Sequence, residues 1–277
     1  MVDDIFKGYD VVPFGTQLIP WCCGTVEYGS HGIVYGAKDL IRIVTRFGKD
    51  ATGIRPVMEC ILCQPTEDTS FMASLFWPNN LWLHPPILYG LFKDWDGESY
   101  YDEDALPKKI YAEMSDESGQ VMETLDAELR HVVCKLSEVP ELQHDVFLKL
   151  NYSLEHNIKL NYGTQVGDGS TIQSTVMTCK AFGQHKIPYE PDPDTVDRIR
   201  PVKDHKFFLT DLPYGLIPVK NIAILCGCDT PLMDDIIYWN QRINGKEYMV
   251  DGKLVGRDID ECIYHEKFEI DMSKLNE

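Results

Sequence analysis

The sequence is short of positive charge: 26 lysines and arginines stand against 44 aspartates and glutamates, for a formal net charge of −18 at pH 7. Such a surface repels nucleic-acid phosphates and anionic lipid, so neither is an expected partner. No apolar run approaches the ~20 residues that a membrane-spanning helix needs. The opening MVDDIFKGYD has neither the basic nor the apolar region of a secretory signal. We expect a cytoplasmic protein, in which a small metabolite could bind a locally basic pocket.

Two motifs for bound groups are also missing. No strand is followed by a GxGxxG turn, which would hold the pyrophosphate of a dinucleotide at a helix N-terminus. The segment Gly167–Thr171 lacks the third glycine, and no predicted strand precedes it. Cys60 and Cys63 form a CxxC pair without a second pair of ligands, so no metal site is expected. The nine scattered cysteines are typical of reduced thiols in a cytosolic protein.

Hydrophobic periodicity divides the chain near residue 70 into a short strand-rich part and a long helical part. β-Branched and aromatic runs between turn signals predict strands at residues 9–14, 32–36 and 40–47. Residues 54–63 fit either a short helix or a further strand. Apolar positions at three- and four-residue steps predict helices at 107–138, 212–226 and 230–245, with weaker candidates at 144–157 and 170–182. The proline-rich segment 183–205 is expected to be irregular.

One candidate catalytic residue is His84, which is followed directly by two prolines. Each proline fixes its own φ and restricts the residue before it, so the histidine is held rigidly. Rigid placement suits a general acid or base. The same pattern also fits a buried histidine that caps a helix end, and spacing alone leaves both interpretations open.

A second candidate is Asp211, which precedes an apparent helix start in the run TDLPYG. The exposed N–H groups of a helix N-terminus would favour its ionised form. An ionised aspartate can hold a histidine in one tautomer and stabilise the imidazolium. Plain N-capping of the helix explains the same position, so this alternative is also open.

Three segments together resemble the octopine/nopaline type of opine dehydrogenase. They are IPWCCGTVEYGSHGIVYGAKD (19–39), HPPILYGLFKDWDG (84–97) and the long run from FFLTDLPYG to VGRDI (207–259). The resemblance implies an α/β remnant, an incomplete Rossmann-type domain over residues 1–70. A mainly α-helical substrate-binding domain like the C-terminal domain of 6-phosphogluconate dehydrogenase would follow over residues 71–277.

The resemblance also implies a reaction, the NADH-dependent reductive condensation of an amino acid with pyruvate or another 2-oxo acid. By position, His84 matches the family's acid/base histidine and Asp211 matches its partner aspartate. Cys23 matches a cysteine that lines the oxo-acid site, and Asn80 lies in the run before the histidine. Lys206 stands where the family places an arginine, five residues before the aspartate. The expected partners are therefore these two small molecules, with NAD as cofactor.

The sequence departs from the family pattern in three places. Without the glycine turn, tight binding of NADH by this chain alone is not expected. The sequence is then either truncated at its N-terminus, as a fragment or an incomplete gene model, or a paralogue that has lost the chemistry. Lys206 keeps the charge of the arginine but loses its two-pronged match to a carboxylate, and Arg198 or Arg200 could substitute. Leu18 stands where the family tends to have a hydroxyl residue.

Three functional hypotheses follow. The first is an opine dehydrogenase-like oxidoreductase. The second is a non-catalytic paralogue that has lost the cofactor site and binds an amino acid or a partner protein. The third, a polyol or hydroxyacid dehydrogenase on a related scaffold, fits the HPPILYG and TDLPYG runs less well.

Overall fold

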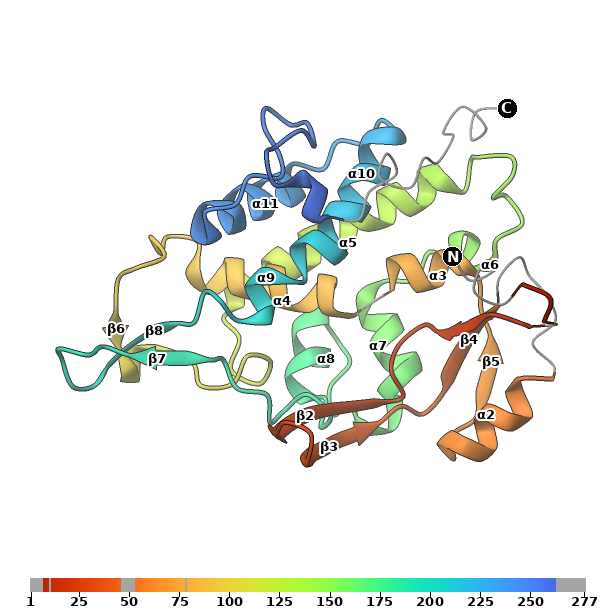
Figure 1. The fold of residues 1–277 in the computed structure, drawn as a ribbon, viewed down its shortest axis with the longest axis horizontal. Coiled ribbons are helices and arrows are strands. Elements are labelled where there is room, and N and C mark those ends of the chain that lie inside the picture. The colour runs from red at the N-terminus through yellow and green to blue at the C-terminus, as the bar shows by residue number, and fades with distance from the viewer. Residues whose placement is uncertain (1–6, 10, 46–52, 78, 263–277) are drawn as a thin grey trace.

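The computed structural model describes residues 7–9, 11–45, 53–77 and 79–262. Figure 1 shows a small strand-containing part at one end of a larger helical body, with the β2–β3 hairpin reaching beneath the helices. This arrangement confirms the expected order of an α/β remnant followed by a mainly helical part. None of the described helices is both long and apolar enough to cross a membrane.

The first sheet has the strand order β1-β4-β5, formed by β1 (Phe14–Thr16), β4 (Ile41–Thr45) and β5 (Thr66–Asp68). β1 is antiparallel to β4, whereas β4 and β5 are parallel, and α2 (Arg55–Leu62) comes between them in the chain. A parallel pair joined through a helix is the unit from which Rossmann-type domains are built. The two isoleucines of β4 are almost completely buried, so this strand anchors the sheet to the core.

The second β element is the hairpin of β2 (Trp21–Glu27) and β3 (His31–Ala37). Its base is fixed to the helical part by several hydrogen bonds. The amide N–H of Asp39 donates to the carbonyl of Asn161 at 2.8 Å, Gln165 Nε2 donates to the carbonyl of Ala37 at 2.6 Å, and Asp39 accepts from the hydroxyl of Thr164 at 2.7 Å. The hairpin therefore has a defined position over the helices.

The helical body is built around α4 (Asn79–Phe92) and α5 (Asp116–Leu136), which pack against each other. The backbones come close at Gly90, where an added Cβ would lie 2.5 Å from the Cα of Ser118. Helices α10 (Ile217–Leu225) and α11 (Pro231–Asn244) pack on α5. The remaining helical elements are α3 (Phe71–Phe76), α6 (Val146–Leu150), α7 (Leu154–Tyr162), α8 (Ile172–Thr178), α9 (Lys206–Leu209), a π-helical turn (Leu212–Leu216) and 3-10 turns at Glu103–Ala105, Gly163–Gln165 and Ile259–Glu261.

Several sequence predictions about these elements need correction. The strand expected at 9–14 is wrong, since β1 begins only at Phe14, and residue 10 lies outside the described residues. Residues 40–47 contain β4, although 46 and 47 lie outside the described residues. Residues 54–63 form a helix rather than a strand. The helix expected from residue 107 begins only at Asp116, because Ser115 caps it by accepting from the N–H of Ser118 at 3.1 Å.

The segment expected to be irregular, 183–205, contains two short strands. β7 (Tyr189–Pro191) and β8 (Arg198–Pro201) pair antiparallel, and β6 (Tyr101–Asp102) joins β8 on its other side. The weak candidate 144–157 is broken into α6 and the start of α7 at Asn151, which adopts a left-handed conformation with φ 41°. Residues 172–178 of the other weak candidate are helical.

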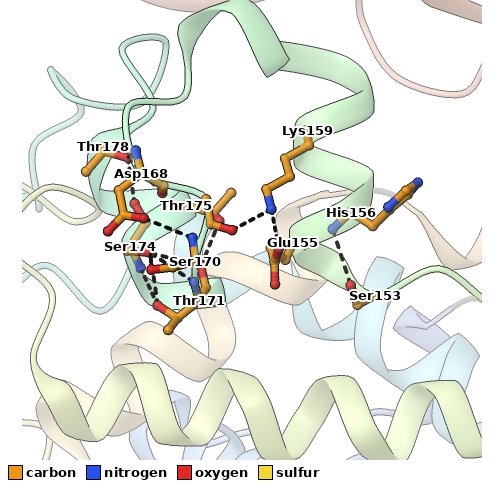
Figure 2. A network of polar contacts seen from close by, with 11 residues as sticks. Ser153, Glu155, His156, Lys159, Asp168, Ser170, Thr171, Ser174, Thr175 and Thr178 are labelled. Atoms are coloured by element: carbon orange, nitrogen blue, oxygen red, sulfur yellow. Dashed lines mark hydrogen bonds and ion pairs between the residues drawn. The ribbon is translucent and has the colours of Figure 1, made fainter.

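The glycine-containing segment Gly167–Thr171 is a helix cap and not a phosphate turn. Figure 2 shows the reciprocal capping contacts of Thr171 and Ser174 at the start of α8. Thr171 Oγ1 accepts from the N–H of Ser174, and Ser174 Oγ accepts from the N–H of Thr171, both at 3.0 Å. Lys159 closes the loop by donating to the carbonyl of Gly169. The element before this glycine-containing segment is a 3-10 turn at Gly163–Gln165. The sequence likewise predicted no strand at this place.

Candidate active site

The five residues named from the sequence line one cavity of about 440 Å³. They are Cys23, Asn80, His84, Lys206 and Asp211. The hairpin contributes the first of them, α4 the next two, and α9 with the residues that follow it the last two. The fold therefore brings together three segments that are far apart in the sequence. A cavity of this size is within the range that binds small metabolites.

The centre of the cavity wall is a hydrogen-bonded pair of His84 and Asp211. The distance from His84 Nδ1 to Asp211 Oδ2 is 2.6 Å, and the two residues are only 5% and 8% exposed. Asp211 directly precedes the π-helical turn, but its side chain caps no backbone N–H there. His84 lies inside α4 and not at a helix end. Both capping interpretations are therefore wrong, and the carboxylate fixes Nδ1 as a donor instead.

Two prolines inside α4 set the surroundings of His84. Pro85 and Pro86 lack N–H groups, so two intrahelical hydrogen bonds that an ordinary helix would make are missing around this position. The helix persists because nearly all of this stretch is buried against its neighbours. The ring of Phe207, 4.0 Å from the imidazole between centroids, covers the histidine from α9. The imidazole is thus held by packing as well as by its partner.

Tyr111 is a member of the site that the sequence analysis missed. Its hydroxyl lies 2.6 Å from His84 Nε2, and its ring also lines the cavity. Because Asp211 accepts from Nδ1, a neutral His84 accepts the Tyr111 O–H at Nε2. Burial raises the pKa of Tyr111 well above its ordinary value, so the phenol keeps its proton. The residue sits in a turn before α5 with no motif around it, and no sequence signal marked it.

Lys38 is a second missed residue, although it lies in the segment 19–39 that resembles the family. It follows β3, is only 4% exposed, and donates to the carbonyl of Ile19. Its Nζ lies 5.1 Å from the centre of the Tyr162 ring. Burial lowers the pKa of Lys38 to about 8, so the side chain is still mostly charged at pH 7. A buried ammonium group in a cavity wall is a ready partner for a carboxylate.

The two other histidines of the cavity favour the neutral form. The His185 Nδ1 donates to the carbonyl of Phe182 at 3.1 Å, and Nε2 lies 3.6 Å from the Cys22 Sγ. Burial lowers the pKa of His185, and burial with the neighbouring Lys206 lowers the pKa of His205. Burial also raises the pKa of the Cys22 thiol to about 11, so it is not a thiolate nucleophile.

The basic residues that the sequence offered for the site differ in their position relative to the cavity. Lys206 is exposed at the cavity, and neither Arg198 nor Arg200 lines it. Arg198 donates to the carbonyl of Tyr100, and Arg200 pairs with Glu190 at 2.5 Å, so the expected substitution by an arginine is wrong. Among the described residues no group of three or more histidine, cysteine or acidic side chains could hold a metal.

Comparison with known proteins matches residues 67–244 to the model of the family "NAD/NADP octopine/nopaline dehydrogenase, alpha-helical domain". The chain belongs to this family. Among its relatives, tauropine dehydrogenase of Arabella iricolor is 29% identical over 262 residues, which cover 92% of this chain and 63% of the relative. Opine dehydrogenase of Haliotis discus hannai is 24% identical and covers 91% and 61%. The chain thus spans a little over three fifths of these family members.

A solved structure of octopine dehydrogenase, described as a complex with NADH and L-arginine, has a similar fold. Its TM-score is 0.74 at 21% identity, with 94% of this chain and 63% of that chain covered. Apo yersinopine dehydrogenase is more distant, with a TM-score of 0.51 at 11% identity, and covers 87% and 60%. At these identities the likeness shows the family's fold and not its ligands.

Proposed function

We propose that this chain carries the substrate side of an opine dehydrogenase reaction, the NADH-dependent reductive condensation of an amino acid with a 2-oxo acid such as pyruvate. The observation that carries the proposal is the buried 2.6 Å contact between His84 and Asp211 in the wall of the cavity. The family membership of the chain and the basic residues around this pair support it.

His84 acts in the proposal as the general acid of the condensation. The amine attacks the carbonyl carbon, and the carbonyl oxygen takes a first proton as negative charge builds on it. The amine nitrogen returns a proton to the site, and a second protonation of the oxygen lets it leave as water, so that an iminium forms. An imidazolium supplies both the proton and positive potential. Asp211 keeps Nδ1 protonated, so Nε2 is the nitrogen that exchanges its proton. The Tyr111 hydroxyl is hydrogen-bonded to Nε2, so we assign Tyr111 the role of a proton relay. Tyr111 gives its proton to the substrate oxygen and takes one from Nε2 of His84.

The carboxylates of the two substrates need cationic partners, and two lysines provide them in the proposal. Lys38 is buried and hydrogen-bonded to the carbonyl of Ile19, whereas Lys206 is exposed at the cavity. An ammonium group binds a carboxylate as a point charge and not through a two-pronged fork. Cys23 and Asn80 line the same cavity, and we place them beside the bound oxo acid.

The hydride of the family's reaction comes from NADH. The described residues offer no glycine-rich turn between a strand and a helix to hold a pyrophosphate, so they do not by themselves fit the dinucleotide. The steps assigned to this chain's residues therefore end at the condensation. We place the protein in the cytoplasm, because all nine cysteines are free thiols, as a reducing compartment favours.

A glycine-rich turn that could hold the cofactor is missing from the described residues, and this favours a second function, a non-catalytic paralogue that binds an amino acid or a partner protein. Such a protein would keep the cationic cavity without the cofactor site. An assay of the purified chain separates the two functions: opine formation from pyruvate and an amino acid is followed with cyanoborohydride as the hydride donor, and calorimetry measures the binding of each compound. Opine formation that the chain accelerates over the uncatalysed rate supports the enzyme. Amino-acid binding without such acceleration supports the binding protein and refutes the proposed reaction.

A further inference from the structure

We infer that the amine substrate of this cavity has a neutral or anionic tail, and that the cavity discriminates against amines with a cationic tail such as arginine. The inference rests on the proposed function and adds to it the class of the amine. It comes from the charges that line the cavity and not from its shape.

The lining residues include three lysines, Lys38, Lys186 and Lys206, but a single carboxylate, Asp211. That carboxylate is already in contact with His84 at 2.6 Å. The other polar groups around the cavity are hydroxyls, thiols, one amide and two histidines whose pKa values are lowered. A guanidinium or ammonium tail would therefore find no free counter-ion on the described wall.

The three lysines of the cavity exceed the two carboxylates that the proposed substrates bring. The two substrates bring one carboxylate each, and in the proposed function Lys38 and Lys206 take them. Lys186 is then left at the exposed side of the cavity without an assigned partner. A second anionic group on the amine would satisfy Lys186, and an amine with one anionic group, such as alanine or taurine, would leave it hydrated. A cationic tail would be repelled by all three lysines.

The expected discrimination is large enough to measure. Two like charges about 4 Å apart repel by roughly 1 kcal/mol in water and several times more near a protein surface. We therefore expect L-arginine, which has the same carboxylate as L-alanine, to bind about tenfold or more weakly than L-alanine. Agmatine, which has a cationic tail and no carboxylate, should bind more weakly still.

Calorimetric titration of the full chain at low salt tests the inference with four amines, L-alanine, taurine, L-arginine and agmatine. The variant Lys186→Glu should improve the binding of arginine relative to taurine about fivefold or more, and Lys186→Gln should have an intermediate effect. Lys180→Glu is the matched control, since it changes the net charge equally at an exposed lysine that does not line the cavity. It should leave the ratio unchanged.

A separate titration with pyruvate distinguishes the possible failures. If pyruvate binds but arginine binds as tightly as alanine, the inference is wrong and the proposed function stands. An unchanged arginine-to-taurine ratio in Lys186→Glu also overturns the inference. If neither pyruvate nor any amine binds, the proposed function falls and the inference falls with it.

Discussion

Replacement of Lys38 by methionine should stabilise the folded chain at pH 7 and weaken its binding of a 2-oxo acid. Burial lowers the pKa of Lys38 from 10.5 to about 8. A shift of this size corresponds to a cost of roughly 3 kcal/mol for keeping the charge in the folded state. The lost hydrogen bond to the Ile19 carbonyl offsets about 1 kcal/mol of the gain, so we expect a net stabilisation of about 2 kcal/mol.

The change of folding stability with pH follows from the direction of the Lys38 pKa shift. Between pH 8 and 10.5 the unfolded chain holds the Lys38 proton more tightly than the folded chain, so folding stability rises with pH across this window. The cost is fully present below the window and is relieved above it. The methionine variant should therefore lose its advantage as the pH rises through the window, because the wild type gains stability there and the variant has no such proton.

Urea unfolding of both proteins at pH 7 and at about pH 10 measures the two effects. Lys186→Met, at an exposed lysine of the same cavity, is the control and should change stability by less than about 0.5 kcal/mol. Pyruvate should bind about tenfold more weakly to Lys38→Met, since a charged hydrogen-bond partner is gone. A methionine variant that is less stable than the wild type at pH 7, or that binds pyruvate equally well, would refute the reasoning.

Three further predictions follow from single contacts. Asp211→Asn should lower turnover about 100-fold or more, because the amide no longer keeps the proton on Nδ1 of His84; steady-state kinetics that match the wild type would contradict this. Tyr111→Phe should lower turnover about tenfold or more while the Kd of pyruvate changes less than about twofold, and equal losses in both would point to a structural role. Asp126→Asn should stabilise the fold by roughly 2–3 kcal/mol at pH 7, since burial raises the Asp126 pKa to about 6 and an amide oxygen can still accept from the N–H of Leu154. Wild-type stability should fall as the pH rises from about 4 to 6, because the folded chain binds the Asp126 proton more tightly; a variant with the same slope in urea unfolding would speak against this.

The long helices could be predicted from the sequence, apart from the start of α5, since their periodicity and their packing agree. The apolar stripe of α5 is buried as expected, and α11 starts with Pro231 and ends before Gly245, which adopts φ 64°. The stop at Gly227 after α10 follows the same rule, with φ 65°. Local signals are reliable where propensity, capping and burial all favour one structure.

The elements that could not be predicted are those in which packing overrides the local signal. α4 continues through Pro85 and Pro86, which a sequence reading takes as a helix end. The hairpin strand β2 was part of the family resemblance, but its mostly exposed residues have no buried face to mark it as a strand. The division into parts at residue 70 stays a prediction.

The candidate site was predictable only as far as its motifs reached. His84, Asp211 and Cys23 lie in runs that resemble the family, and all three line the cavity. Tyr111 and Lys38 also line the cavity, yet each is placed by a contact with a residue that is not its neighbour in the sequence, His84 and Ile19. No spacing in a single sequence encodes such contacts. The role of each residue stays a prediction.

The most direct test of the central claim is the rate of opine formation from pyruvate and an amino acid, compared between the wild-type chain and His84→Gln. Glutamine keeps a polar group in the buried position but cannot exchange a proton near neutral pH. With cyanoborohydride as the hydride donor, we predict that the wild type accelerates opine formation and that the variant, with an unchanged circular dichroism spectrum, is slower by about 100-fold or more. A folded His84→Gln variant with wild-type turnover would contradict the account.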